Sequence, residues 1–381
     1  MTRFIVETLR NRGFEPVLAH YEPYSMSPHL SVPCFKLGRQ GPGAERRRTF
    51  EDCETHAIGA WLPELEFTHY QPTAAWLELM VSSAAHLAVS GNALSAMPYL
   101  RTGRPFVAWV ATGWAADRKD RVAHFPWPRQ VLDWLLNGPV LRRQERRVLR
   151  AGTILALSEY TAQTLDAVAG ESVTAGVLPM PVDTSFFFPR PAAVVRGRIG
   201  FSGRLDDPRK NLELLLQALA NANRAGAALT ALLIGGTLDE AMRKRIGDLG
   251  LEGAVEILPF LPRTPLRDHL QTLDLFALPS HQEGLCIAAL EAMACGCPVV
   301  STRCGGPEEF VIAGETGRTV GFDPAEMAEV LTHTVADRDQ RQRLAGGARR
   351  RVEGHYTLAK AEDVFWSCFD RTFPHLAEKS P

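Results

Sequence analysis

The chain has 381 residues, of which 45% are hydrophobic and 22% are charged, and its formal net charge at pH 7 is −1. This length indicates two domains or one large domain, and the composition excludes a disordered, collagen-like or disulfide-scaffold protein. Because 42 basic side chains balance 43 acidic ones, the sequence also argues against a nucleic-acid partner that binds a basic surface over the whole protein.

The first half of the chain predicts an α/β domain with irregular spacing. Residues 1–12 have the pattern of a helix, and Gly13 is a typical residue at a helix end. Apolar and β-branched runs then predict five strands, because such side chains suit a pleated, partly buried surface. These runs are residues 14–21, 30–35, 86–91, 105–112 and 153–158.

Residues 126–152 mix tryptophans and leucines with a run of arginines. A basic amphipathic region of this kind can contact an anionic membrane that carries a lipid-linked acceptor. The alternative is an ordinary helix that covers the first sheet and leaves its arginines in solvent. Pro139 interrupts the helical pattern and favours this second interpretation.

A connector divides the chain. Residues 177–191 contain four prolines, which predict a stiff, extended segment between a domain of residues 1–180 and a domain of residues 191–355. The final amphipathic pattern, from residue 356 to about residue 379, predicts a helix. It either caps the second domain or returns to pack on the first.

The second half predicts a doubly wound domain. From Arg198 to Phe322, six strand-like runs alternate with helical patterns, which is typical of a parallel sheet with helices on both faces. Ligands bind such sheets at the carboxyl ends of the strands. Three strand ends carry the pairs Gly203-Arg204, Gly235-Gly236 and Glu283-Gly284.

The segment from Gly203 to Asn211 is the first candidate site. A strand ends in Gly203, and Arg204, Arg209 and Lys210 follow before the next helix. Arginine guanidinium groups, the lysine ammonium and the N–H groups of a helix N-terminus can together bind a diphosphate. The alternative is a solvated loop in which Asp206 and Asp207 pair with Arg209.

Two carboxylates form the second candidate site. Glu283 precedes a helix that is expected to begin near Leu285, and Glu291 lies eight residues further along. The N–H groups of Gly284, Leu285 and Cys286 are expected to point at an anion. The alternative for Glu291 is an acid on the helix surface, but its apolar neighbours favour a side chain that needs a partner.

No metal site is predicted. Four of the seven cysteines lie between residues 286 and 304, but their spacing lacks the paired C-x-x-C pattern of zinc sites. The odd number of cysteines favours reduced thiols and a cytoplasmic protein. Asp337 and Asp339 form an Asp-x-Asp pattern in a charged helical stretch, which we interpret as a solvated face.

Residues 198–219 and 277–320 resemble the retaining family 4 (group 1) glycosyltransferases, which have the GT-B fold. The matching elements are Glu283-x7-Glu291 and the ordered set Gly203, Arg204, Leu205, Lys210 and Asn211. The resemblance covers about residues 150–356. It implies two Rossmann-like doubly wound domains that face a cleft, with the acceptor on the side of the first domain and a nucleotide-diphosphate sugar in the second.

The resemblance also implies roles for these residues. Arg204 and Lys210 would bind the diphosphate and stabilise the leaving group, so that with Glu283 they form the catalytic set. Glu283 would bind hydroxyls of the sugar, and Glu291 those of the ribose. Members of the family commonly transfer a hexose with retention and without a metal or another cofactor, in polysaccharide, glycolipid or glycoconjugate synthesis.

One departure from the family leaves two hypotheses open. Relatives begin with a β-strand and a glycine-rich loop, whereas residues 1–12 predict a helix, so this opening strand is expected to be missing. The chain is then either an active transferase, cytoplasmic or bound to the inner face of the cytoplasmic membrane, or a non-catalytic homologue. Such a homologue would bind a nucleotide sugar or act as a partner subunit.

Overall fold

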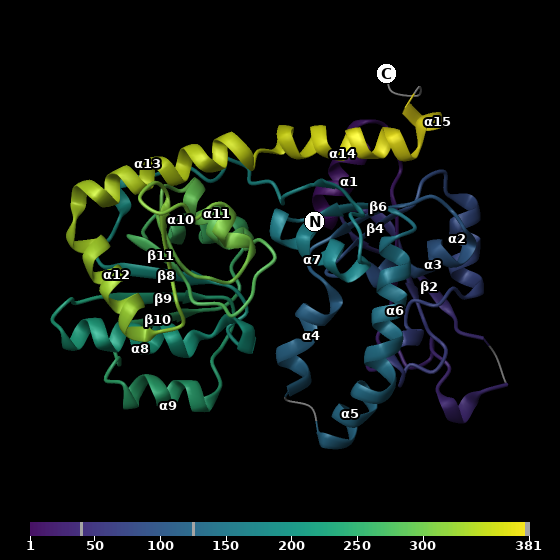
Figure 1. Ribbon diagram of the computed structural model, residues 1–381, viewed down its shortest axis with the longest axis horizontal. Coiled ribbons are helices and arrows are strands. Elements are labelled where there is room, and N and C mark those ends of the chain that lie inside the picture. The colour runs from purple at the N-terminus through teal and green to yellow at the C-terminus, as the bar shows by residue number, and fades with distance from the viewer. Residues whose placement is uncertain (39–40, 124–125, 378–381) are drawn as a thin grey trace. The chain divides into compact units, whose positions relative to one another are not determined.

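The computed structural model describes residues 1–38, 41–123 and 126–377 (Figure 1). The chain forms two compact units, one of Met1–Leu178 with Glu362–Pro381 and the other of Pro179–Ala361. The division thus falls inside the proline-rich connector. No helix of the described part is both long and apolar enough to cross a membrane.

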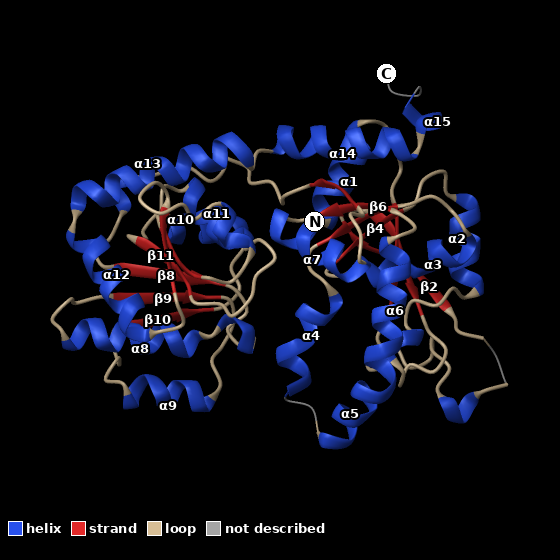
Figure 2. Cartoon of the chain, viewed as in Figure 1, coloured by secondary structure: helices blue, strands red, loops and turns tan. Residues whose placement is uncertain are grey.

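The second unit contains a six-stranded sheet in the order β10-β9-β8-β11-β12-β13. Every pair of neighbours in it is parallel, and helices lie on both sides of it (Figure 2). The expected doubly wound sheet is therefore confirmed. The strands are β8 (Arg198–Ser202), β9 (Thr230–Ile234), β10 (Val255–Leu258), β11 (Leu275–Leu278), β12 (Val299–Thr302) and β13 (Gly317–Val320).

The helices of this unit bury apolar stripes against the sheet. In the helix of residues 212–224, Leu215, Leu216 and Leu219 occupy positions i, i+1 and i+4 on one face, and each is at most 1% exposed. The expected helix of residues 285–295 begins two residues later, at Ile287. The helices are α8 (Leu212–Arg224), α9 (Glu240–Asp248), α10 (Arg263–Leu270), α11 (Ile287–Ala294), α12 (Pro324–Ala336) and α13 (Arg338–His355).

The first unit contains two sheets. A parallel sheet has the order β4-β5-β6-β7, and a smaller sheet has the order β1-β3-β2, in which β2 is antiparallel to β3. The strands are β1 (Val17–Tyr21), β2 (Ala44–Phe50), β3 (Cys53–Ile58), β4 (Leu87–Ser90), β5 (Val107–Val110), β6 (Thr153–Ala156) and β7 (Thr174–Val177).

The prediction of a strand at residues 30–35 is wrong. A 3₁₀ turn at Cys34–Lys36 occupies its end, and Pro33 before it cannot donate a ladder hydrogen bond. The sequence also misses β2 and β3. Their sequences AERRRTF and CETHAI carry charged side chains, which hide the apolar alternation that identifies a strand.

The helices of the first unit include α1, which confirms the helix expected at the N-terminus. Its residues Phe4, Ile5, Val6 and Leu9 are buried. α1 covers Thr2–Asn11, and the other helices are α2 (Ala74–Ser82), α3 (Met97–Thr102), α4 (Trp114–Ala123), α5 (Trp127–Leu132), α6 (Gly138–Leu149), α7 (Glu159–Ala169) and α15 (Pro374–Ala377). A further helix, α14 (Leu358–Thr372), begins in the last residues of the second unit and continues into the first.

The last long helix, α14, packs on α1. The Arg12 guanidinium lies 3.8 Å from the centre of the Trp366 ring and 3.3 Å from a carboxylate oxygen of Asp370. These contacts favour the second of the two expected roles, a return to the first half of the chain. Residues 378 and 379 of the expected helix lie outside the described residues.

Candidate functional site

The loops after β8 and β11 meet where the strand order of the second unit reverses. β8 pairs with β11 in the middle of the sheet, so both loops leave from neighbouring carboxyl ends. Asn211 ends the first loop with a left-handed φ of 48°. Its side-chain amide donates to the carbonyl oxygen of Pro279 after β11, at 3.2 Å. This hydrogen bond fixes the two loops against each other.

Two glycines allow β8 and β9 to end in close contact. The N–H of Gly203 donates to the carbonyl oxygen of Ile234 at 2.9 Å. Gly235 follows with φ of 131°, and a Cβ on it would stand 2.0 Å from the carbonyl oxygen of Gly203. Both the backbone angle and the lack of space therefore require glycine at position 235.

Lys210 and Glu283 form an ion pair across the two loops. The Lys210 ammonium lies 2.6 Å from Oε1 of Glu283, and the two side chains are only 15% and 11% exposed. The Ser280 hydroxyl donates to the same oxygen at 2.7 Å. Burial would lower the pKa of Lys210, but the negative charge of Glu283 outweighs it and raises this pKa above its ordinary value. Lys210 is therefore held as a cation at this edge of the sheet.

Arg204 lies further out on the same loop. Its side chain is 59% exposed, and Nη2 contacts Oδ2 of Asp207 at 2.6 Å. Asp207 also binds the guanidinium of Arg209 at 2.9 Å and accepts the N–H of Arg209 at 3.1 Å. The alternative of a loop that pairs its own charges is thus realised at Asp207, while Lys210 pairs across to the second loop.

The segment from Glu283 to Cys286 is held by the loop after β12. The N–H of Glu283 donates to the carbonyl oxygen of Cys304 at 2.8 Å, and the N–H of Gly306 donates to that of Glu283 at 3.0 Å. Cys286, the N-cap of α11, has a left-handed φ of 69°. Since α11 starts at Ile287, the N–H groups that its first turn leaves without helical acceptors belong to residues 286–289. Gly284 and Leu285 precede that turn, contrary to the sequence prediction.

Glu291 lies on the second turn of α11, apart from the Lys210–Glu283 pair. Its partly buried side chain sits between Ala292 and Leu290, both fully buried. Burial raises the pKa of Glu291 to about 7, and the positive charge of Arg263 opposes this shift. The partial burial of Glu291 therefore favours a side chain that needs a partner over a fully solvated acid on the helix surface.

The structure offers no metal cluster among the residues that it describes. Asp337 caps the N-terminus of α13 by accepting the N–H of Gln340 at 2.9 Å. Burial raises the pKa of Cys295 to about 12 and that of Cys304 to about 11, so these cysteines are thiols at neutral pH. Cys295 and Cys304 are thus buried thiols, whereas Asp337 is a partly buried helix cap and not the solvated side chain that the sequence predicted.

A buried polar cluster at the end of β5 was not anticipated from the sequence. Glu145 on α6 accepts the N–H of Trp114 at 2.7 Å, and the Trp114 indole donates to Glu66 at 3.2 Å. Arg118 on α4 bridges Glu66 and Asp133. Because Glu145 stands among arginines in the sequence, its pattern resembles that of a solvated helix and gives no signal of burial.

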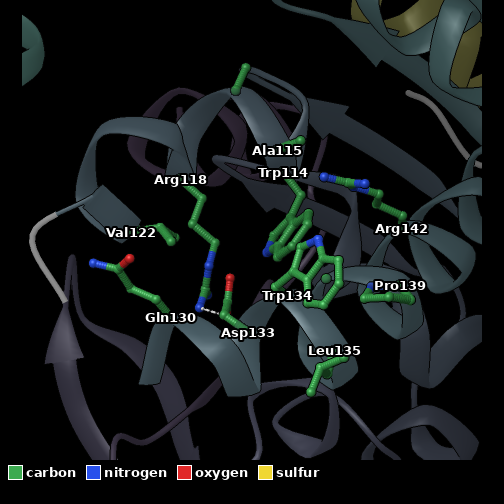
Figure 3. A pocket seen from close by; sticks show the side chains of 12 residues that line it. Trp114, Ala115, Arg118, Val122, Gln130, Asp133, Trp134, Leu135, Pro139 and Arg142 are labelled. Carbon is green, nitrogen blue, oxygen red and sulfur yellow. Dashed lines mark hydrogen bonds and ion pairs between the residues drawn. The ribbon is translucent and has the colours of Figure 1, made fainter. Parts of the chain in front are cut away.

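A pocket of about 860 Å³ opens beside this cluster. Figure 3 shows Arg118 pointing toward Asp133, with the rings of Trp114 and Trp134 next to them. Other lining residues are Ala115, Ala116, Val122, Gln130, Leu135, Gly138, Pro139 and Arg142. The pocket is thus lined by the Arg118–Asp133 ion pair and by apolar side chains, and all of its lining residues belong to the first unit.

Residues 187–351 match the family model described as "Glycosyl transferases group 1". This segment is a group 1 glycosyltransferase domain. The match includes all the residues of the candidate site in the second unit. It confirms the family that the motifs around Lys210, Glu283 and Glu291 indicated.

Curated proteins that resemble this chain are named as glycosyltransferases. It is 31% identical over 245 residues to a D-inositol 3-phosphate glycosyltransferase of Frankia alni, covering 58% of this chain and 60% of that protein. It is 35% identical over 242 residues to a GDP-mannose-dependent alpha-(1-6)-phosphatidylinositol monomannoside mannosyltransferase of Mycolicibacterium smegmatis, covering 58% and 61%. The matches therefore span about three-fifths of these relatives' lengths.

Solved structures extend the likeness to the fold of the whole chain. The sucrose-phosphate synthase of Thermosynechococcus elongatus superposes with a TM-score of 0.72 at 18% identity, over 98% of this chain and 93% of that one. Anabaena HepE in complex with UDP-glucose superposes with a TM-score of 0.66 at 18% identity, over 83% and 86%. The expected GT-B fold, with α/β units built on parallel sheets, is thereby confirmed.

Proposed function

We propose that the chain transfers a hexose from a nucleotide-diphosphate sugar to an acceptor hydroxyl, with retention of the anomeric configuration. The observation that carries the proposal is the Lys210–Glu283 pair at the strand-order reversal of a group 1 domain. At this point an open parallel sheet binds its ligand, and the pair supplies both a cation and an anion there.

Lys210 binds the diphosphate in this proposal. It is held as an ammonium, and it is buried enough for its charge to act at short range on a phosphate oxygen. Arg204 adds a second cation from the outer part of the loop, and the first turn of α11 adds backbone N–H groups with the positive end of its dipole. These groups stabilise the negative charge that develops on the departing diphosphate.

Glu283 and Glu291 bind hydroxyl groups. Glu283 already accepts hydrogen bonds from Lys210 and Ser280, so once the diphosphate engages Lys210 the carboxylate can accept from sugar hydroxyls instead. Glu291, two turns into the helix, reaches a different part of an extended donor and accepts from the ribose hydroxyls. With cations on the diphosphate, a bound metal is not required.

The acceptor is proposed as a polyol, free or carried by a lipid. The relatives are named for inositol 3-phosphate and for a phosphatidylinositol mannoside, which places a sugar or cyclitol hydroxyl in their reactions. Polysaccharide, glycolipid or glycoconjugate synthesis is the corresponding process. Since these relatives are named as transferases, the alternative of a non-catalytic homologue is not favoured.

Binding calorimetry with UDP, GDP and ADP, followed by product analysis with sugars of the base that binds, tests the proposal. We expect one nucleotide to bind and one of its sugars to be transferred to an inositol-type acceptor. Failure of all three nucleotides to bind would refute the donor site. Nucleotide binding without any sugar transfer would instead support the alternative hypothesis of a non-catalytic homologue.

A further inference from the structure

An exposed apolar face lies on the helical segment of residues 127–136 in the first unit. Trp127, Val131, Trp134 and Leu135 are spaced at i, i+4, i+7 and i+8, so they share one side of the rod formed by α5 and the π-helical turn of residues 133–137. They are 76%, 44%, 77% and 62% exposed, and Leu132 and Leu136 add 39% and 37%. Six large apolar side chains exposed within one short helical segment are unusual for a surface that faces only water.

The place of this face in the unit makes it accessible. Figure 1 shows α5 at the end of α6 that is farther from strand β6. Arg118, held by Glu66 and Asp133, ties the π-helical turn to α4 and to the segment around residue 66. This buried cluster fixes the turn, on which Trp134 and Leu135 are exposed to solvent and also line the pocket beside the cluster.

Exposed positive charge lies within the apolar face and on the helix that follows it along the chain. Both acids of residues 126–150, Asp133 and Glu145, are buried at 7% and 1% exposure. The arginines of the same stretch are exposed, and within the described part of the chain Arg142, Arg143 and Arg147 make no ion pair with an acid. These exposed arginines are Arg129, Arg142, Arg143, Arg146, Arg147 and Arg150.

We propose that the apolar face of residues 127–136 docks on an anionic lipid bilayer. Tryptophan and leucine side chains enter the boundary between headgroups and acyl chains, while the arginines bind lipid phosphates. A second copy of the chain is a poorer occupant, because it would bring its own arginines against these. The sequence interpretation of a solvated helix that only covers the sheet does not account for the exposed face.

Flotation of the full chain with lipid vesicles tests the proposal. One set of vesicles contains phosphatidylcholine alone, and the other contains phosphatidylcholine and phosphatidylglycerol in equal parts. We expect binding to the anionic set to exceed binding to the neutral set by about 100-fold, since three arginines contribute about fivefold each. High salt is expected to reduce this difference.

The double variant W134S/L135S removes two apolar side chains and is expected to weaken vesicle binding by at least about 30-fold. The matched control is V81S, because Val81 on α2 is also 72% exposed but lies outside the face. A second variant, R142E/R147E, keeps the apolar side chains and is expected to abolish the preference for anionic vesicles.

Wild-type tryptophan fluorescence should also be quenched by lipids brominated on their acyl chains. Equal flotation of W134S/L135S and the wild type would overturn the proposal. So would a wild-type dimer in light scattering that W134S/L135S converts to a monomer, because this would make the face a protein interface. No nucleotide or sugar enters these measurements, so the test leaves the proposed function untouched if it fails.

Discussion

Lys210 and Glu283 are 73 residues apart in sequence, and their side chains meet at 2.6 Å. The pair exists because β8 and β11 are neighbours in the sheet although two strands separate them along the chain. Asn211 reinforces the contact by binding the backbone after β11. A charge pair in this position joins the two loops before any ligand arrives.

Replacing Lys210 by alanine is the most direct test of the donor site. Loss of one charge-assisted contact is expected to weaken nucleotide binding by about 1.5–3 kcal/mol, or roughly 10–150-fold, in calorimetry. Lys244→Ala is the matched control, because Lys244 is an exposed lysine of α9. Arg204→Ala is expected to cost less than Lys210→Ala, since Arg204 is 59% exposed. Equal affinities of Lys210→Ala and the wild type would exclude this lysine from the diphosphate site.

Removal of divalent metal is expected to leave transfer intact. The described residues include no cluster of three metal-ligating side chains, and the proposed site supplies its own cations. Turnover is measured before and after treatment with a chelator, and again after addition of Mn²⁺. If activity disappeared with the chelator and returned with Mn²⁺, the metal-free mechanism would be wrong.

Glu291 is expected to make nucleotide binding depend on pH. With a pKa of about 7 in the free protein, its carboxyl is mostly neutral at pH 6 and mostly ionised at pH 8. A carboxylate accepts hydrogen bonds from ribose hydroxyls better than the neutral acid does, so affinity should rise over this range by about tenfold. Glu291→Gln should bind weakly at both values and lack this rise. Calorimetry at pH 6 and pH 8 measures both proteins, and the same rise in Glu291→Gln would assign the titration to another group.

The sequence specified the second unit more fully than the first. Its strands are short apolar runs that alternate with amphipathic helices, and the residues of the site follow strand ends, where a parallel sheet brings distant positions together. Sequence offered the pairing of Asp207 with Arg209 only as one alternative and did not indicate the contact with Arg204, because several partners for each charge are equally close along the chain. In the first unit, strand β3 contains charged residues and Glu145 stands among arginines, so the sequence shows no apolar pattern from which the strand or the burial of Glu145 could be predicted.

The contact between Gly203 and Gly235 predicts a large effect for a small substitution. Gly235→Ala would place Cβ 2.0 Å from the carbonyl oxygen of Gly203 at a φ of 131°. We expect it to destabilise the second unit by more than about 2 kcal/mol in urea unfolding. Gly226→Ala is the control: Gly226 also has a positive φ, 89°, but a Cβ there meets no atom within 4 Å. Similar losses in both variants would mean that the backbone angle alone, rather than the contact with Gly203, is responsible.

Glu145 is expected to make the stability of the first unit fall as pH rises. Burial raises its pKa to about 7 from the ordinary value of 4.5, although the hydrogen bond from the Trp114 N–H opposes the shift. The folded state therefore binds this proton more tightly than the unfolded state, and stability is lost between about pH 4.5 and pH 7 as the buried carboxyl ionises.

Glu145→Gln cannot ionise, and its side-chain carbonyl can still accept the Trp114 N–H. The free energy of unfolding of Glu145→Gln, relative to the wild type, should therefore increase by about 2 kcal/mol between pH 5 and pH 8. Urea titrations followed by tryptophan fluorescence measure this difference, and any other titrating group contributes equally to both proteins. A difference that stays constant between the two pH values would show that Glu145 is already ionised in the folded protein at pH 5.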